Sequence, residues 1–190
     1  MKIFRQWPNL CMPAAVQSAL YRLGRIKIPQ MVIARQLAWP EIRNQSDIEI
    51  KQWYYDSGPN PEDLVDAQFR INPRLNVRYI YPSSLEELRA ASQKGEIAIL
   101  NYSFVRERLV GERGEGRYTG EEHYAIYLGD DRRNVSLGDT SKWRKPRIEI
   151  VPIPDFLSHW RETNSPIYFD ERKGRAPKQR EAMFLSLERN

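Results

Sequence analysis

The chain has 190 residues, which fits one compact domain because single cores usually stop growing near ~250–300 residues. A hydrophobic content of 41% excludes wholesale disorder, and the net charge of +5 comes from cations interspersed with acids, which indicates a solvated basic surface rather than specific nucleic-acid binding. One cysteine excludes an internal disulfide or a multi-cysteine metal cluster, two histidines exclude a three-histidine metal site, and no cofactor is expected.

The first stretch of the chain lacks the pattern of a secretory signal. Residues 6–21 carry no charge, but prolines, asparagine and glutamine interrupt them, whereas a signal needs an apolar core of ~7–15 residues. No other segment approaches the ~18 apolar residues of a membrane span. We therefore expect a cytoplasmic protein without membrane insertion, which also suits a free thiol.

The first half of the sequence is predicted to be helical. Pro13 begins an apolar pattern that ends at Gly24, and proline in the first turn with glycine at the end is typical of a helix. Cys11 is therefore expected at or just before a helix N-terminus. Three further helices are predicted from apolar spacing between Pro, Gly or Asn residues, over 30–39, 46–55 and 62–69.

From about residue 75 the pattern favours strands. Ser84 and Glu87 form a capping box for one more helix, which is expected to end near Lys94. The continuous apolar run 97–100 is typical of a central strand that is buried on both faces. The strands are expected at 77–81, 97–100, 123–128, 135–139 and 147–151. Helices followed by an antiparallel sheet give an α+β fold.

The last part of the chain is predicted to be helical again. A helix is expected over 154–162 with its aromatic residues facing inward. Residues 1–169 are assigned to one domain, and residues 170–190 to a charged C-terminal tail. Within that tail, residues 178–187 are expected to form a final helix.

Three residues from distant parts of the sequence are the groups that a catalytic cysteine site needs. Cys11 lies at a helix start, where unpaired N–H groups and the helix dipole favour a thiolate. His123 begins a strand directly after the glycine-rich segment 106–120, which is expected to be a mobile loop that acts as a lid or a substrate-binding edge. Asp139 ends the partner strand. A nucleophile, a base and an orienting carboxylate are what an activated cysteine needs.

The expected hairpin brings His123 and Asp139 together. A three-residue loop from Asp130 to Arg132 places Asp139 directly opposite His123. A four-residue loop that ends at Arg133 shifts the register by one residue and leaves the two side chains neighbours. Cross-strand neighbours have Cβ atoms ~4.5–5.5 Å apart, which is within reach of an imidazole–carboxylate hydrogen bond.

An attacked carbonyl also needs donors for its oxyanion. The backbone N–H of Cys11 offers one donor, and the side-chain amide of Gln6 or Asn9 offers a second. Trp7 is predicted either to line the cleft or to anchor the N-terminal segment. The second histidine, His159, is expected to be a packing or surface residue.

These segments resemble a known family. Residues 6–15 (Gln-Trp-Pro-Asn-Leu-Cys-Met-Pro-Ala-Ala) are similar to the active-site segment of papain-like cysteine peptidases, and the closest type is the bacteriocin-processing, double-glycine leader peptidase in its stand-alone form. Residues 122–129 and 135–139 are similar to the histidine strand and the following aspartate of that family. The resemblance implies a papain-like fold, in which the N-terminal helical half packs its cysteine helix on a C-terminal antiparallel sheet.

The resemblance also implies roles for single residues. Cys11 corresponds to the nucleophile, His123 to the base, Asp139 to the orienting residue and Gln6 to the oxyanion donor. Gln6 lies five residues before the cysteine where the family usually has six, which keeps Asn9 as the alternative donor.

The implied activity is that of a cysteine peptidase or amide hydrolase, which acts on a peptide or protein through an acyl-enzyme intermediate. An acyltransferase, a deamidase or a transglutaminase-like enzyme would use the same triad. A papain-like binding protein that has lost catalysis is the remaining alternative. It is motivated by the position of Gln6 and by Met12, a bulky residue beside the nucleophile where the family has glycine.

Overall fold

Five helices precede the first strand and two further helices lie among the strands, in a computed structural model that describes residues 2–7, 10–104, 109–110, 116–117, 121–140, 147–160 and 180–188. The helices are α1 (Cys11–Gly24), α2 (Gln30–Leu37), α3 (Pro40–Arg43), α4 (Asp47–Asp56), α5 (Pro61–Ile71), α6 (Leu85–Gln93) and α7 (Ile153–His159). The strands are β1 (Leu75–Ile80), β2 (Ile97–Phe104), β3 (Leu109–Val110), β4 (Gly116–Arg117), β5 (Glu121–Asp130), β6 (Asn134–Asp139), β7 (Arg147–Pro152) and β8 (Ala182–Leu187). This order confirms the predicted α+β class.

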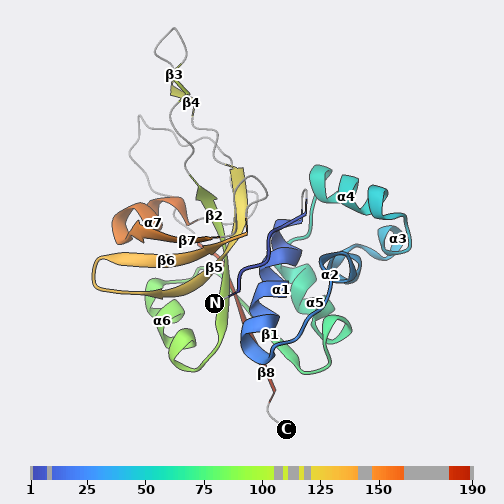
Figure 1. The fold of residues 1–190 in the computed structure, drawn as a ribbon, viewed down its shortest axis with the longest axis horizontal. Coiled ribbons are helices and arrows are strands. Elements are labelled where there is room, and N and C mark those ends of the chain that lie inside the picture. Colours follow the sequence, from blue (N-terminus) through green and yellow to red (C-terminus); the bar gives the residue numbers. More distant parts are fainter. Residues whose placement is uncertain are drawn as a thin grey trace.

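The main sheet has six strands in the order β1-β8-β2-β5-β6-β7, and all of its neighbouring strands are antiparallel. Helices α1 to α5 lie on one side of this sheet, whereas α6 and α7 lie on the other (Figure 1). The short strands β3 and β4 pair with each other outside the main sheet. The sheet is therefore the middle layer of three.

The central strands are buried on both faces, as the apolar run 97–100 predicts. In β2, Ile97 and Ile99 pack in the core cluster that contains α1, α2, α4 and α5. Ala98 and Leu100, which point to the opposite face, pack in the cluster that contains α6 and α7. Because side chains alternate along β2, this strand contributes to both cores, one on each face of the sheet.

The expected helix over residues 178–187 is wrong, because residues 182–187 form strand β8 in the middle of the sheet. Leu187 pairs with Leu75 of β1, and Leu185 pairs with Ile97 of β2. A short apolar run such as 182–185 fits a buried strand as well as one side of a helix, and periodicity alone does not separate the two. Residues 182–187 form a strand because β1 and β2 pair with them on either side.

The helix boundaries follow local signals. The predicted capping box at Ser84 and Glu87 is confirmed, and Ser46 makes a second one with Glu49. The helix expected over 30–39 ends earlier, at Leu37, because the residue before a proline avoids the helical conformation and Pro40 begins α3.

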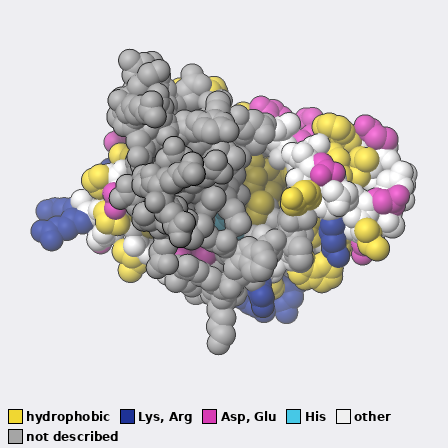
Figure 2. Space-filling model, turned by 90° about the horizontal axis from the view of Figure 1, so that it is seen from above, with side chains coloured by type: hydrophobic (Ala, Val, Ile, Leu, Met, Phe, Trp, Pro, Cys, Tyr) yellow, Lys and Arg dark blue, Asp and Glu magenta, His cyan; other side chains and the backbone are white. Residues whose placement is uncertain are grey.

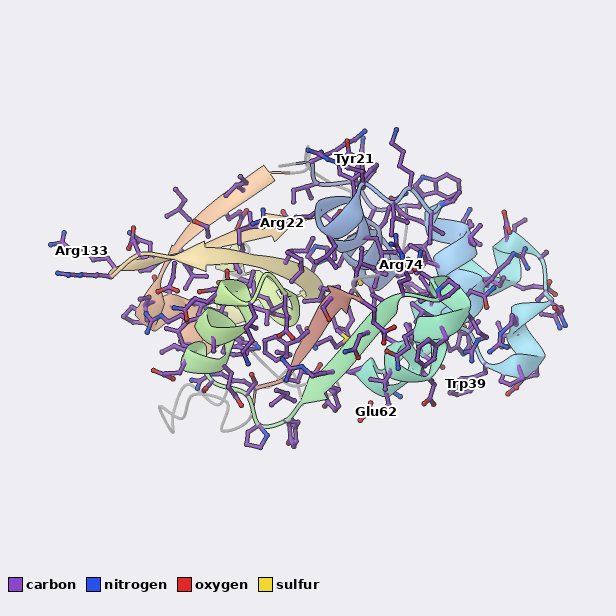
Figure 3. All side chains as sticks on the ribbon, turned by 90° about the horizontal axis from the view of Figure 1, so that it is seen from below. Tyr21, Arg22, Trp39, Glu62, Arg74 and Arg133 are labelled. Atoms are coloured by element: carbon purple, nitrogen blue, oxygen red, sulfur yellow. The ribbon has the colours of Figure 1, made fainter. Side chains whose placement is uncertain are left out.

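Basic side chains are spread over different elements of the molecule. Arg133 points away from the tip of the β5–β6 hairpin, whereas Arg22 and Arg74 lie elsewhere, on α1 and before β1 (Figure 3). Among the described residues, no helix combines the length and the apolar character that crossing a bilayer requires.

Candidate active site

Cys11 is the first residue of α1, and its thiol is half-buried. The preceding residue, Leu10, makes no side-chain cap, so the first N–H groups of the helix are not satisfied in that way. Backbone hydrogen bonds from Met12 and Tyr124 reach the sulfur. One donor therefore comes from the N-terminus of α1 and the other from strand β5, and both stabilise the negative form of the sulfur.

Met12 does not obstruct the thiol, contrary to the expectation of a bulky side chain beside the nucleophile. Its side chain is buried in the helical core with Ala15 and Val16. Successive helical residues point in directions about 100° apart, so the residue after Cys11 can face the core while the thiol faces the sheet.

His123 and Asp139 form a buried pair beside Cys11. The Nε2 atom of His123 lies 3.0 Å from Oδ1 of Asp139, whose side chain is almost fully buried. The imidazole also makes a side-chain hydrogen bond with the Cys11 thiol. Because Nε2 of His123 contacts Asp139, we assign the hydrogen bond with the sulfur to Nδ1, the other ring nitrogen. The structure thus brings together the three residues that the sequence predicted to cooperate.

The register of the hairpin differs from the prediction. Ile126 pairs with Gly138, so Asp139 continues opposite Ala125 and not opposite His123. The turn runs from Asp131 to Asn134, where the N–H of Asp131 donates to the carbonyl oxygen of Asn134, so Asp130 pairs with Val135 and the register is displaced by about three residues from that of the three-residue loop. A bulge between Tyr127 and Gly129, where Gly129 has a φ of 128°, takes back one residue of this displacement.

The two side chains nevertheless meet, because the displacement is two residues. Side chains alternate between the faces of a strand, so an even shift leaves Asp139 on the same face as His123. Their contact is diagonal rather than directly across the strand pair, which a long imidazole bridges. The four-residue loop, which shifts the register by one residue, would have turned the carboxylate to the opposite face, so that alternative does not lead to this contact.

The electrostatics of the pair favour a thiolate and an imidazolium. Burial raises the pKa of the Cys11 thiol, but the hydrogen bond and positive charge of His123 and the two backbone N–H groups outweigh it, so the pKa lies below its ordinary value. Burial lowers the pKa of His123, but hydrogen bonds with Asp139 and Cys11 and their negative charges raise it to about 9. Both shifts stabilise the same charged pair at neutral pH.

We expect iodoacetamide to alkylate Cys11 with a pH midpoint below that of the same thiol in the urea-unfolded chain. The thiolate is the reactive form, so a lowered pKa keeps the rate high at neutral pH and moves its fall to a more acidic range. The measurement is unambiguous because the chain has one cysteine. Equal midpoints for the folded and unfolded chains would contradict the ion pair.

The N-terminal segment places Gln6 at the same site. Its backbone N–H donates to the carbonyl oxygen of Thr140 at 2.8 Å, and the Thr140 hydroxyl contacts its Oε1 atom at 3.4 Å. No sequence argument singled out Thr140, although it directly follows Asp139. The alternative donor, Asn9, lies outside the described residues.

Trp7 is anchored by its backbone while its ring stays at the surface. Its N–H donates to Oε1 of Gln30, whereas its side chain is 51% exposed beneath the ammonium group of Lys51. Seen from above, apolar side chains are exposed over the helical half of the molecule among acidic ones (Figure 2). The ring of Trp7 is thus one of several large apolar groups at the surface.

Three further expectations concern neighbouring parts of the chain. Most of the segment 106–120 lies outside the described residues, and its described parts pair as β3 and β4. The Nδ1 atom of His159 donates a hydrogen bond at 2.6 Å to the Asp155 carbonyl oxygen, and the ring lies beside that of Tyr102, as a packing histidine does. Within the described ranges, no group of three or more His, Cys, Asp or Glu residues is placed to hold a metal ion.

The fold that carries this site is similar to two solved structures. A putative C39-like peptidase from Bacillus anthracis has a TM-score of 0.61 at 15% identity, covering 100% of this chain and 96% of the other. The peptidase domain of Streptococcus ComA, a bi-functional ABC transporter involved in a quorum-sensing pathway, has a TM-score of 0.55 at 16% identity, covering 98% of each chain. No family model and no curated protein matches the sequence. These likenesses confirm, at the level of the fold, the papain-like arrangement that the sequence resemblance implied.

Proposed function

We infer that this protein is a cysteine peptidase or amide hydrolase that uses Cys11, His123 and Asp139. The observation that carries this proposal is the buried hydrogen-bonded series from the thiol through His123 to Asp139, at the N-terminus of α1. Its charge state, a thiolate beside an imidazolium, is that of a nucleophile with its proton already held by the base. The likeness to two peptidase structures supports a peptide or protein as the substrate.

The first half of the reaction forms an acyl-enzyme. The Cys11 sulfur attacks the carbonyl carbon, and the carbonyl π electrons move to the oxygen, which becomes an oxyanion. The amide N–H groups near the start of α1 and the side chain of Gln6 are the donors for that oxyanion. The oxyanion then collapses, the C–N bond breaks, and the imidazolium of His123 gives its proton to the leaving amine. A thioester on Cys11 remains.

The second half releases the acyl group. Neutral His123 takes a proton from water, and the hydroxide attacks the thioester carbonyl. Collapse of this second tetrahedral intermediate expels the Cys11 thiolate and yields a carboxylic acid, while His123 keeps the proton. Asp139 holds the ring through Nε2 in both steps and stabilises its positive charge, which leaves Nδ1 for the sulfur and the substrate.

The proposal predicts that Cys11→Ala abolishes cleavage of peptides. Wild-type protein and the variant are incubated with a mixture of peptides from digested cell protein, and new termini are identified by mass spectrometry. We expect cleavage by the wild type only, with a loss above pH 9 because the leaving amine needs the proton of His123. Peptides that stay intact with wild-type protein, together with a slowly reacting thiol, would favour a binding protein.

The same experiment separates hydrolysis from acyl transfer. Hydroxylamine competes with water for the thioester, so a hydrolase gives mainly carboxylic acid at low hydroxylamine and a transferase gives mainly hydroxamate. Release of ammonia without chain cleavage would indicate a deamidase. Each product has its own mass, and each reaction requires Cys11.

A further inference from the structure

Thr140 links the predicted oxyanion donor to the predicted base. Its side chain is fully buried, and its Oγ1 atom lies 3.3 Å from Nε2 of His123 and 3.4 Å from Oε1 of Gln6. Contacts of this length are long for a hydroxyl, and catalytic hydrogen bonds often shorten once a substrate is bound. One hydroxyl thus lies between two side chains that come from distant parts of the sequence.

The chemistry of the three groups fixes the direction of both hydrogen bonds. Nε2 of His123 faces the Asp139 carboxylate, so it carries a proton and shares it with the Thr140 oxygen. Oε1 of Gln6 only accepts, so the single hydroxyl proton of Thr140 must point to it. The NH2 end of the Gln6 amide is therefore turned away from Thr140. Within the described part of the chain, that nitrogen has no hydrogen-bond partner.

The backbone around Gln6 is held from the helical side by Gln30. The amide of this buried side chain accepts from the N–H of Trp7 at 2.9 Å and donates to the carbonyl oxygen of Arg5 at 2.8 Å. Thr140 holds Gln6 from the sheet side through its carbonyl oxygen as well as its hydroxyl. With the backbone fixed at both neighbours, rotation of the Gln6 side chain is the freedom that remains, and the Thr140 hydroxyl restricts it.

We propose that Thr140 is a positioning residue that orients the carboxamide of Gln6, so that its NH2 group faces the oxyanion formed at Cys11. This proposal rests on the proposed function, because an oxyanion forms only if Cys11 attacks a carbonyl group. Thr140 does not touch the reacting atoms, and its effect is expressed through Gln6. The hydroxyl is therefore needed for acyl transfer to the sulfur but much less for simple alkylation, which forms no oxyanion.

The test compares two reactions of Cys11 in Thr140→Val, Thr140→Ser and Gln6→Ala. Acylation by p-nitrophenyl acetate forms an oxyanion, whereas alkylation by iodoacetamide does not. We expect Thr140→Val to slow acylation by about tenfold or more and alkylation by less than about threefold. Thr140→Ser keeps the hydroxyl and should restore acylation to within about threefold. Ser136→Ala removes a hydroxyl from β6, the strand that Thr140 directly follows, and is the matched control.

The decisive measurement is the double variant. In the Gln6→Ala background, Thr140→Val should cause no further loss of acylation, because the group that it orients is gone. An undiminished loss in that background would overturn the proposal, as would an equal loss of alkylation, which would place the effect on His123. A folded Thr140→Ser protein as impaired as Thr140→Val would also overturn it. A wild-type thiol that is slow in both reactions would overturn the proposed function, and this inference with it.

Discussion

Replacing His123 by alanine is expected to lower the rate of acyl transfer to Cys11 by about 10²–10⁴ at neutral pH. The ring supplies the hydrogen bond and the positive charge that lower the pKa of the buried thiol. Without them, burial, which is the largest single influence on this pKa and favours the neutral thiol, is opposed only by the backbone hydrogen bonds from Met12 and Tyr124. The variant should therefore lack both the thiolate form of Cys11 at neutral pH and the general acid. Its alkylation midpoint should move to or above that of the unfolded chain.

His159→Ala is the matched control for this variant, since it is the only other histidine of the chain. Its ring contacts the Asp155 carbonyl oxygen and Tyr102, and neither residue takes part in the proposed reaction. Acylation rates in this control should stay within about twofold of wild type. A His123→Ala protein that is folded by circular dichroism and still acylates at the wild-type rate would remove His123 from the mechanism.

Replacing Phe184 by alanine is expected to lower the free energy of unfolding by about 3–5 kcal/mol. The side chain is 1% exposed in the middle of β8, within the core cluster beneath α6 and α7. Its loss leaves a cavity between the sheet and helices α6 and α7, and it also removes a ring that lies 5.1 Å from the Arg78 guanidinium. For a domain of this length the melting temperature should fall by roughly 10 °C. Urea titration followed by circular dichroism measures the effect.

Phe69→Ala provides the comparison for a phenylalanine of the same size in an exposed position. This side chain is 62% exposed on α5, so its removal should change the free energy of unfolding by no more than about 0.5 kcal/mol. If the two variants were equally stable, residues 182–187 would not form the central strand. The pair thus tests the correction that the structure makes to the predicted C-terminal helix.

The parts of the site that the sequence predicted rest on local patterns. Pro13 and Gly24 mark the ends of α1, so the position of Cys11 at a helix start follows from its neighbours alone. His123 and Asp139 belong to one hairpin, and the alternation of side chains keeps them on one face despite a register error of two residues. A local pattern tolerates such errors, provided that they are even.

The parts that the sequence did not predict depend on contacts between distant segments. Gln30 lies in a helix, and nothing in the sequence around it indicates that its side chain hydrogen-bonds with the backbone of Arg5 and Trp7. Thr140 acquires its role from Gln6, which precedes it by most of the chain. The composition of β8 fits a helix as well as a strand, and its pairing with β1 and β2 is what makes it a strand. Such contacts are properties of the fold rather than of any window of sequence.

The place of β8 in the sheet also sets an order of events during folding. Among the described strands, β1 pairs only with β8, so the sheet hydrogen bonds of residue 75 cannot form until residue 187 has been made. Pairings this distant in sequence carry a large loop-closure cost and slow the folding of a domain. On a ribosome, β1 emerges long before its partner and remains an open edge in the interval. A chaperone that shields extended apolar segments would therefore be expected to bind the nascent chain at residues 75–80 until β8 arrives.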